Sequence, residues 1–274
     1  MTGWLSCWYA ELRKAVLSPV VLLTAVGAVL VAAGMGLYGY RNAHRHFRDD
    51  APATYIADPA GALYAAAQHS GTFVGLVLAA ALAGALYAVE CESGMWPSLL
   101  ASRPGRARMI ALKAAVALLL TAAFTVVLAA VLLVAGRTAA GVTGFAASDG
   151  PGWGAAALAV ARSLVVQALF VAVAFTAAAL TRRTVATMAG ALGPVIVLAP
   201  VVGIDGITPL HPQTWVAAWL RLQEEAQYSL YLWTREPSPG TGAPGVVALL
   251  ALAAVHVGVL ALAARGDRLF RPAD

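Results

Sequence analysis

AAVALLLTAAFTVVLAAVLLVA, residues 114–135, is a run of 22 residues without a single charged side chain. The hydrocarbon layer of a bilayer is about 30 Å thick, and a helix needs about 20 apolar residues to cross it. Lipid offers the backbone no hydrogen-bond partners, so a crossing segment of this kind must be helical. The stretch therefore predicts a transmembrane helix and, with it, a helical membrane protein.

The composition of the whole chain agrees with this run. Of its 274 residues, 61% are hydrophobic and 11% are charged, and the mean hydropathy is +0.78. Soluble globular domains have about 45–50% apolar and about 25% charged residues. The segments between the apolar runs are also too short to build a second hydrophobic core. We predict one transmembrane domain over residues 1–274.

Six runs have the required length and almost no charge, and they predict six transmembrane helices in an all-α fold. The runs are 19–40, 72–89, 114–135, 155–180, 184–203 and 246–264. Eleven of the 18 Lys and Arg residues lie before the first run or after the second, fourth and sixth runs. Because Lys and Arg concentrate on the cytoplasmic side, both termini are expected in the cytoplasm. The expected location is the cytoplasmic membrane, as a multi-pass protein.

The net charge of +5 is explained by the Lys and Arg residues at the cytoplasmic ends of the predicted spans, where anionic headgroups attract them. We therefore predict no nucleic-acid binding. Cys7 and Cys91 both fall on the expected cytoplasmic side, which predicts reduced thiols. The histidines lack metal-ligand spacing, so no metal site is assigned. The chain also has no Gly-x-x-x-x-Gly-Lys-Ser/Thr phosphate loop, so we expect it to bind no ATP itself. No catalytic residue is assigned.

Two segments outside the six runs have helical spacing of apolar residues. Residues 2–17 place Trp4, Trp8 and Leu12 on one face before Ser18 and Pro19. This pattern predicts a short amphipathic helix lying in the headgroup layer, in contact with membrane lipids. The expected outer loop, residues 204–243, predicts one or two interfacial or partly re-entrant helices.

The most informative segment joins the second and third runs. A connection between bundle helices usually has about 2–8 residues, and this one is longer. It begins with acids, continues through a glycine and an apolar pair, and ends with basic residues. Its defining residues are Glu90, Glu92, Gly94, Leu99, Leu100, Arg103, Pro104, Arg106, Arg108 and Lys113. The pattern predicts a short amphipathic helix that docks on a partner, and the plain alternative is an ordinary basic loop punctuated by Pro and Gly.

The order of these residues resembles the loop after the second span of ABC-2 type transporter permeases. The resemblance rests on Glu90-x-x-x-Gly94, Leu99-Leu100, Arg103-Pro104-Gly105-Arg106 and Lys113. Met95 stands where the family pattern usually has Thr. Pro97 falls inside the expected helix, whose first turn tolerates a proline. The amphipathic N-terminal segment, the six runs and the long outer segment before the last run fit the same family.

The resemblance implies a permease subunit of an ATP-driven exporter that moves a hydrophobic or amphipathic compound, such as an antibiotic, a peptide or a lipid. Residues 90–113 would form the cytoplasmic coupling helix and its flanks, in contact with an ABC ATPase subunit. A second permease protomer, identical or different, would complete the transporter. ATP would be bound and hydrolysed on the ATPase chain, so this chain is not expected to be an enzyme.

Two alternatives belong to other classes of protein. An ion-coupled secondary transporter normally has an acid or base near the bilayer midplane, or broken helices with an internal repeat. A membrane immunity or anchor subunit would not transport at all. Gln167 and His256 are the polar residues within the runs that are candidates for a substrate path, and a hydrogen bond between helices is the alternative for both.

Overall fold

The computed structural model describes residues 2–46, 52–95, 105–143, 151–198, 212–220 and 242–265, and every regular element in these ranges is a helix. The first half of the chain contains α1 Thr2–Val16, α2 Pro19–His46, η1 Pro52–Ala57, α3 Pro59–Ser70, α4 Phe73–Ala83, η2 Gly84–Ala88 and α5 Val89–Glu92. The second half contains α7 Arg106–Thr143, α8 Trp153–Thr181, α9 Thr184–Leu198, α10 Pro212–Leu220 and α11 Gly242–Arg265. The predicted all-α fold is confirmed for this part of the chain.

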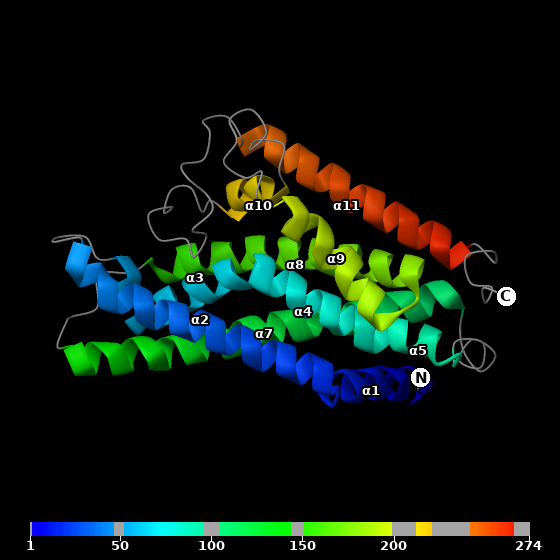
Figure 1. Cartoon of the computed structure of the whole chain (residues 1–274), viewed down its shortest axis with the longest axis horizontal. Helices are drawn as coiled ribbons and strands as arrows, with labels where there is room; N and C mark the ends of the chain where they lie inside the picture. The colour runs from blue at the N-terminus through cyan, green and yellow to red at the C-terminus, as the bar shows by residue number, and fades with distance from the viewer. Residues whose placement is uncertain are drawn as a thin grey trace.

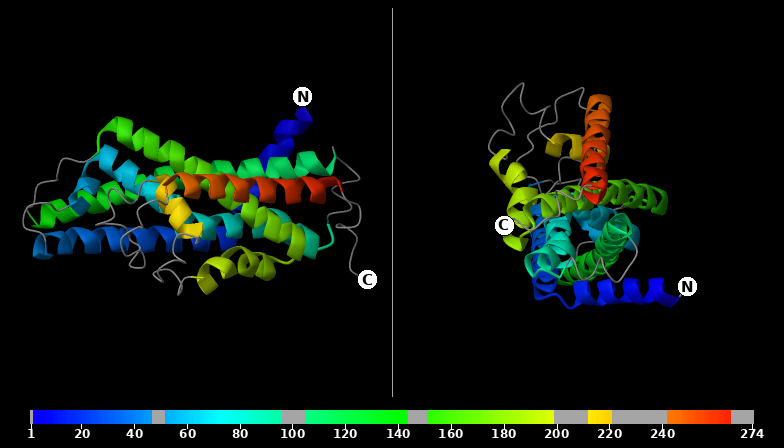
Figure 2. Two further views of the ribbon diagram at one scale, coloured as in Figure 1. Left: turned by 90° about the horizontal axis from the view of Figure 1, so that it is seen from above. Right: turned by 90° about the vertical axis from the view of Figure 1, so that its right-hand side faces the viewer.

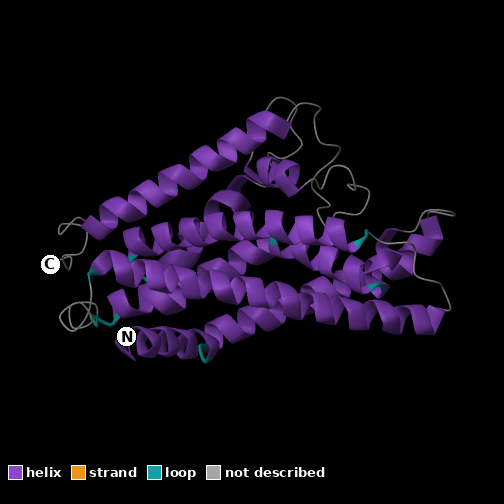
Figure 3. Ribbon diagram, turned by 180° about the vertical axis from the view of Figure 1, so that it is seen from behind, coloured by secondary structure: helices purple, strands orange, loops and turns teal. Residues whose placement is uncertain are grey.

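The helices form an elongated bundle in which α2, α4, α7 and α8 run along the long axis (Figure 1). We call the end that carries α1, α5 and the last turn of α11 the proximal end. The opposite end, which carries η1, the end of α7 and the start of α8, is the distal end. The right-hand view of Figure 2 shows α11 on the outside of the bundle, where it contacts α8 and α7. The view from behind shows that α1 begins and α11 ends at the same, proximal end (Figure 3).

Four of the described helices are long and apolar enough to cross a membrane, namely Phe73–Glu92, Ala107–Val142, Trp153–Thr181 and Val246–Arg265. A fifth candidate is the pair Leu5–Val16 and Pro19–Gly34, which is bent by 60°. Thr184–Val197 is apolar but shorter, and the rest of the predicted run 184–203 lies outside the described residues. Length and composition thus give a membrane-embedded protein with four or five spans in the described residues, where the sequence predicted six.

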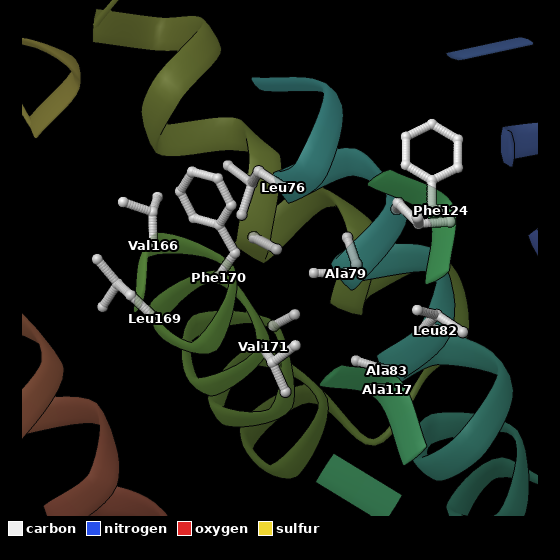
Figure 4. Packing of buried hydrophobic residues seen from close by; sticks show 14 of the residues in the cluster. Leu76, Ala79, Leu82, Ala83, Ala117, Phe124, Val166, Leu169, Phe170 and Val171 are labelled. Carbon is white, nitrogen blue, oxygen red and sulfur yellow. The ribbon is translucent and has the colours of Figure 1, made fainter. Parts of the chain in front are cut away.

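The centre of the bundle is built from small residues. Ala79, Ala80 and Ala83 of α4 are fully buried, and α4 packs against α7 and α8. Figure 4 shows Ala79 and Leu82 of α4 within this cluster, with Leu76 beside Phe170 of α8. Small side chains let helix backbones approach closely, which is the usual basis of helix association in membranes. The alanine-rich runs therefore supply the core.

The N-terminal helix predicted from residues 2–17 is present as α1, and Trp8 and Leu12 of its predicted apolar face are partly buried against the core. Cys7, Glu11 and Ala15, spaced four residues apart, form the stripe that faces the bundle. Leu5 and Tyr9 are exposed on other faces. Because α1 is bent by 60° from α2, it lies across the proximal end rather than along the bundle. This orientation suits a helix at a membrane surface.

Between the first two predicted spans, six spans with cytoplasmic termini predict an outer loop. The described part of this segment folds into η1 and α3. Asp58 caps α3, because its Oδ2 accepts hydrogen bonds from the N–H groups of Ala60 and Gly61. A Cβ at Gly136 of α7 would lie 2.7 Å from backbone atoms of η1, so glycine is what lets η1 lie on α7. α3 and α4 follow each other along the chain and are separated only by Gly71 and Thr72. This break in the helical rod formed by α3 and α4 lies beside Ser163 of α8.

Candidate functional site at the proximal end

Four charged side chains from three elements meet at the proximal end, and we call them the ionic cluster: Glu11, Lys14, Glu90 and Lys113. The Lys113 ammonium lies 2.7 Å from Oε2 of Glu11 and 2.9 Å from Oε1 of Glu90. The Lys14 ammonium lies 2.7 Å from the same oxygen of Glu90. The cluster therefore joins α1 to α5 and α7.

Burial makes the charge balance of this cluster important. Lys113 is completely buried, and the residues Glu90 and Glu11 are 3% and 7% exposed. An isolated charge in such a place would cost several kcal/mol, whereas paired charges largely offset this cost. The two carboxylates and two ammonium groups form a neutral set. Removal of any one member leaves a buried net charge.

A Schellman motif closes the C-terminal end of α5. Gly94 has a φ of 68°, in the left-handed region. The N–H of Gly94 donates to the carbonyl of Cys91, and the N–H of Met95 donates to the carbonyl of Glu90. This is the pattern in which a left-handed glycine closes a helix and satisfies its last carbonyls. The motif thereby closes α5 and fixes the backbone of Gly94 and Met95 against it.

Glu92 makes the third connection of α5. Its Oε2 accepts hydrogen bonds from the backbone N–H and the hydroxyl of Thr184, at 3.1 Å and 3.0 Å. Thr184 is the first residue of α9, so Glu92 caps a helix 92 residues away in the sequence. Glu90 and Glu92 lie about 200° apart around the helix axis, because each residue turns an α-helix by about 100°. α5 thus has one carboxylate for α1 and α7 and another for α9.

The structure places the residues predicted for the coupling segment in different environments. Glu90 and Lys113 are brought together inside the bundle. Glu92 caps the start of α9, and Gly94 closes the end of α5. Arg108 is exposed at the start of α7. Arg106 begins α7, but its side chain is not described. Leu99, Leu100, Arg103 and Pro104, and with them the predicted coupling helix, lie outside the described residues.

The sequence patterns did not identify Glu11 and Lys14 as members of this site. The sequence predicts only that they lie near the end of an interfacial helix, where charges are normally solvated. Their i, i+3 spacing makes them neighbours on the surface of α1, and this spacing is the one feature of the sequence that pairs them. Their partners, however, lie 102 and 76 residues away, as the contacts with Lys113 and Glu90 show.

Gln167 faces the bundle interior and is the centre of a second polar group, which we call the polar chain. Its Nε2 donates to Thr125 Oγ1 and to Ser163 Oγ, both at 3.0 Å. Thr125 Oγ1 donates to Ser70 Oγ at 2.8 Å, which donates to the carbonyl of Ala66. The polar chain therefore links α8 to α7 and α3, while Gln167 Oε1 is buried without a hydrogen bond.

His256 is not part of the polar chain. It lies on α11, and its backbone carbonyl accepts a hydrogen bond from Thr176 of α8 at 3.4 Å. Thr176 is nine residues from Gln167 along α8, which is about 13 Å of helix. The two residues predicted for a substrate path are therefore not brought together.

Comparison of the chain with protein-family models gives no match, and comparison with curated proteins gives no match either.

Proposed function

We propose that this chain is the permease subunit of an ATP-driven ABC-2 type exporter that moves a hydrophobic or amphipathic compound across the cytoplasmic membrane. The observation that carries the proposal is the threefold anchoring of α5. If the ATPase displaces residues 96–104, that displacement reaches the spans only through a rigid connection between this segment and the spans. The ionic cluster, the Schellman motif and the Glu92 cap provide such a junction at the base of residues 96–104.

In this proposal the partner ATPase contacts residues 96–104 and the exposed basic residues beside them. ATP binding closes the ATPase pair, and the displacement passes through α5 to α1, α7 and α9. A second protomer completes the translocation path, whose two states differ in the arrangement of helices at the interface between protomers. Glu90 and Lys113 act inside this chain as anchors rather than as contact residues, because both are buried.

The proposal includes six spans with both termini in the cytoplasm. α2 and α9 supply the first and fifth spans beside the four long apolar helices. The proximal end carries the exposed side chains of Arg13, Arg108, Arg183 and Arg265. A collection of exposed arginines at one end of the bundle favours the cytoplasmic side for that end and contact with anionic headgroups.

An ion-coupled secondary transporter is the second candidate, and one observation favours it. The rod formed by α3 and α4 is broken at Gly71 and Thr72, close to the polar chain. In many secondary transporters a broken helix places backbone polar groups beside the substrate or ion. The polar chain contains no carboxylate, however, so it supplies no charged ligand for an ion.

Co-purification tests the exporter proposal. We expect an ABC ATPase to be encoded beside the gene of this chain. The tagged chain is expressed together with that ATPase, which is expected to remain bound in detergent. Reversal of charge in Arg103→Glu/Arg106→Glu is expected to release the ATPase while the permease still inserts. The distal variant Arg137→Glu is the matched control and should keep the complex intact. An ATPase that does not bind the wild-type chain would contradict the proposal.

A further inference from the structure

We propose that Glu92 is a positioning residue that holds the start of α9 in register with α5, so that displacement of the segment after α5 reaches α9 as well as α1 and α7. This inference rests on the proposed function for its role in transport. Its structural content, the attachment of α9 to α5, can be measured without transport.

The first step is the contact itself. A single carboxylate oxygen of Glu92 accepts both the N–H and the hydroxyl of Thr184. The N–H groups of a helix's first turn have no partner within the helix, so a carboxylate is a favourable acceptor there. Most caps come from the residue just before the helix. Here the acceptor comes from another span, which makes the cap a joint between two helices.

The second step is the exposure of Glu92. The side chain is exposed, unlike that of Glu90 two residues earlier. An exposed cap of this kind contributes little to global stability compared with the buried ionic cluster. Its consequence is geometric: it fixes which part of α9 lies against α5. Gly84 of the preceding η2 permits this placement, because a Cβ added at Gly84 would lie only 3.2 Å from the methyl carbon of Thr184.

The third step is the freedom of α9. The turn from α8 to α9 contains only Arg182, which has a φ of 54°, and Arg183. Further along α9, Ile196 and Val197 are 57% and 74% exposed. α9 therefore packs on the bundle through Ala191, Leu192 and Val195, while Ile196 and Val197 near its end face outward. A displacement of α5 that pulls Thr184 would tilt the whole helix about the α8–α9 turn.

The fourth step is a matched comparison within the same chain. Asp58 caps α3 with the same chemistry, one carboxylate oxygen accepting two hydrogen bonds, but within its own turn. Asp58→Ala therefore removes a local cap at the distal end. Glu92→Ala removes a cap that joins two helices, and Glu92→Gln keeps an amide oxygen that can still accept from Thr184.

The experiment measures both attachment and transport. Spin labels at Val126→Cys of α7 and Ile196→Cys of α9, both exposed positions, are introduced into a Cys7→Ser/Cys91→Ser background. The distance distribution between them is expected to broaden or shift in Glu92→Ala, and to stay unchanged in Glu92→Gln and Asp58→Ala. An unchanged distribution in Glu92→Ala, or an equal change in Asp58→Ala, overturns the inference.

Transport is then measured in the complex with the ATPase. Glu92→Ala is expected to lower ATP-driven transport about fivefold, the factor by which a typical cap changes an equilibrium, with the ATPase still bound. Glu92→Gln should restore transport, which a merely destabilised fold would not show. Full transport by Glu92→Ala overturns its role in coupling. If the wild-type complex shows no ATP-driven transport, the proposed function fails, and the label distances alone decide whether Glu92 positions α9.

Discussion

The ionic cluster at the proximal end and the polar chain around Gln167 both tie three elements together, yet they differ in what holds them. The ionic cluster joins α1, α5 and α7 through three buried charges, those of Glu11, Glu90 and Lys113, and the partly exposed ammonium group of Lys14. The polar chain joins α3, α7 and α8 through an amide and hydroxyl groups. A hydroxyl that loses its partner can turn to a carbonyl of its own helix, and the carbonyl oxygen of Thr121 lies 3.2 Å from Thr125 Oγ1. A buried charge that loses its partner has no such alternative.

The largest effect is expected at Lys113. Lys113→Met leaves Glu11 and Glu90 buried against Lys14 alone, so the free energy of unfolding should fall by about 3–5 kcal/mol. Unfolding in detergent micelles, followed by tryptophan fluorescence, measures this loss. Arg108→Met, an exposed position on the same helix, is the control and should change stability by less than about 0.5 kcal/mol.

A double variant sharpens the test of Lys113. Glu11→Gln/Lys113→Met restores neutrality, because only Glu90 and Lys14 stay charged in the ionic cluster. It should therefore be more stable than Lys113→Met alone. If adding Glu11→Gln lowers stability further, charge balance is not what makes the cluster sensitive.

An intermediate effect is expected where η1 crosses α7 at the distal end. Gly136→Ala places a Cβ 2.7 Å from the backbone of η1, and the resulting shift should cost about 1–3 kcal/mol. Gly141→Ala on the same helix is the control, since no atom lies within 4 Å of the added Cβ. The two variants are compared by thermal unfolding. Equal melting temperatures would mean that η1 does not lie on α7 as described.

The smallest effect is expected in the polar chain. Gln167→Leu removes two hydrogen bonds between neutral groups, one to Thr125 of α7 and one to Ser163 of the same helix. A bond of the first kind, between membrane helices, contributes about 0.6 kcal/mol on average. We expect a loss of about 1 kcal/mol by the same unfolding measurement. Ser163→Ala, which removes one of the two bonds, is expected to lose less. A loss as large as that of Lys113→Met would show that the two regions are not held differently.

The sequence predicted the class of fold and much of the helix placement because apolar length is decisive for membrane helices. The run at 72–89 corresponds to α4, η2 and α5, and the run at 155–180 corresponds to α8. The inward position of Gln167 was also predicted, since lipid disfavours an amide. These predictions depend on solvation, which each segment's own residues largely determine.

The details that depend on contacts between distant segments were not predicted. Glu90 and Lys113 were expected on the surface, in contact with a partner protein, because charged residues near span ends are usually solvated. Their burial depends on Glu11 and Lys14 of α1, which no local pattern connects to them. α3 and the π-helical turn η2 were also missed. The residues of η2, GALYA, contain no proline or other local signal for a π turn.

Transport by the reconstituted complex tests the central claim most directly. The permease and its ATPase are placed together in proteoliposomes loaded with a fluorescent amphipathic compound, and its movement is followed with either ATP or an ion gradient as the energy source. We predict movement with ATP and none with a proton or sodium gradient alone. Movement sustained by an ion gradient in vesicles that lack the ATPase would contradict the account and favour the secondary transporter.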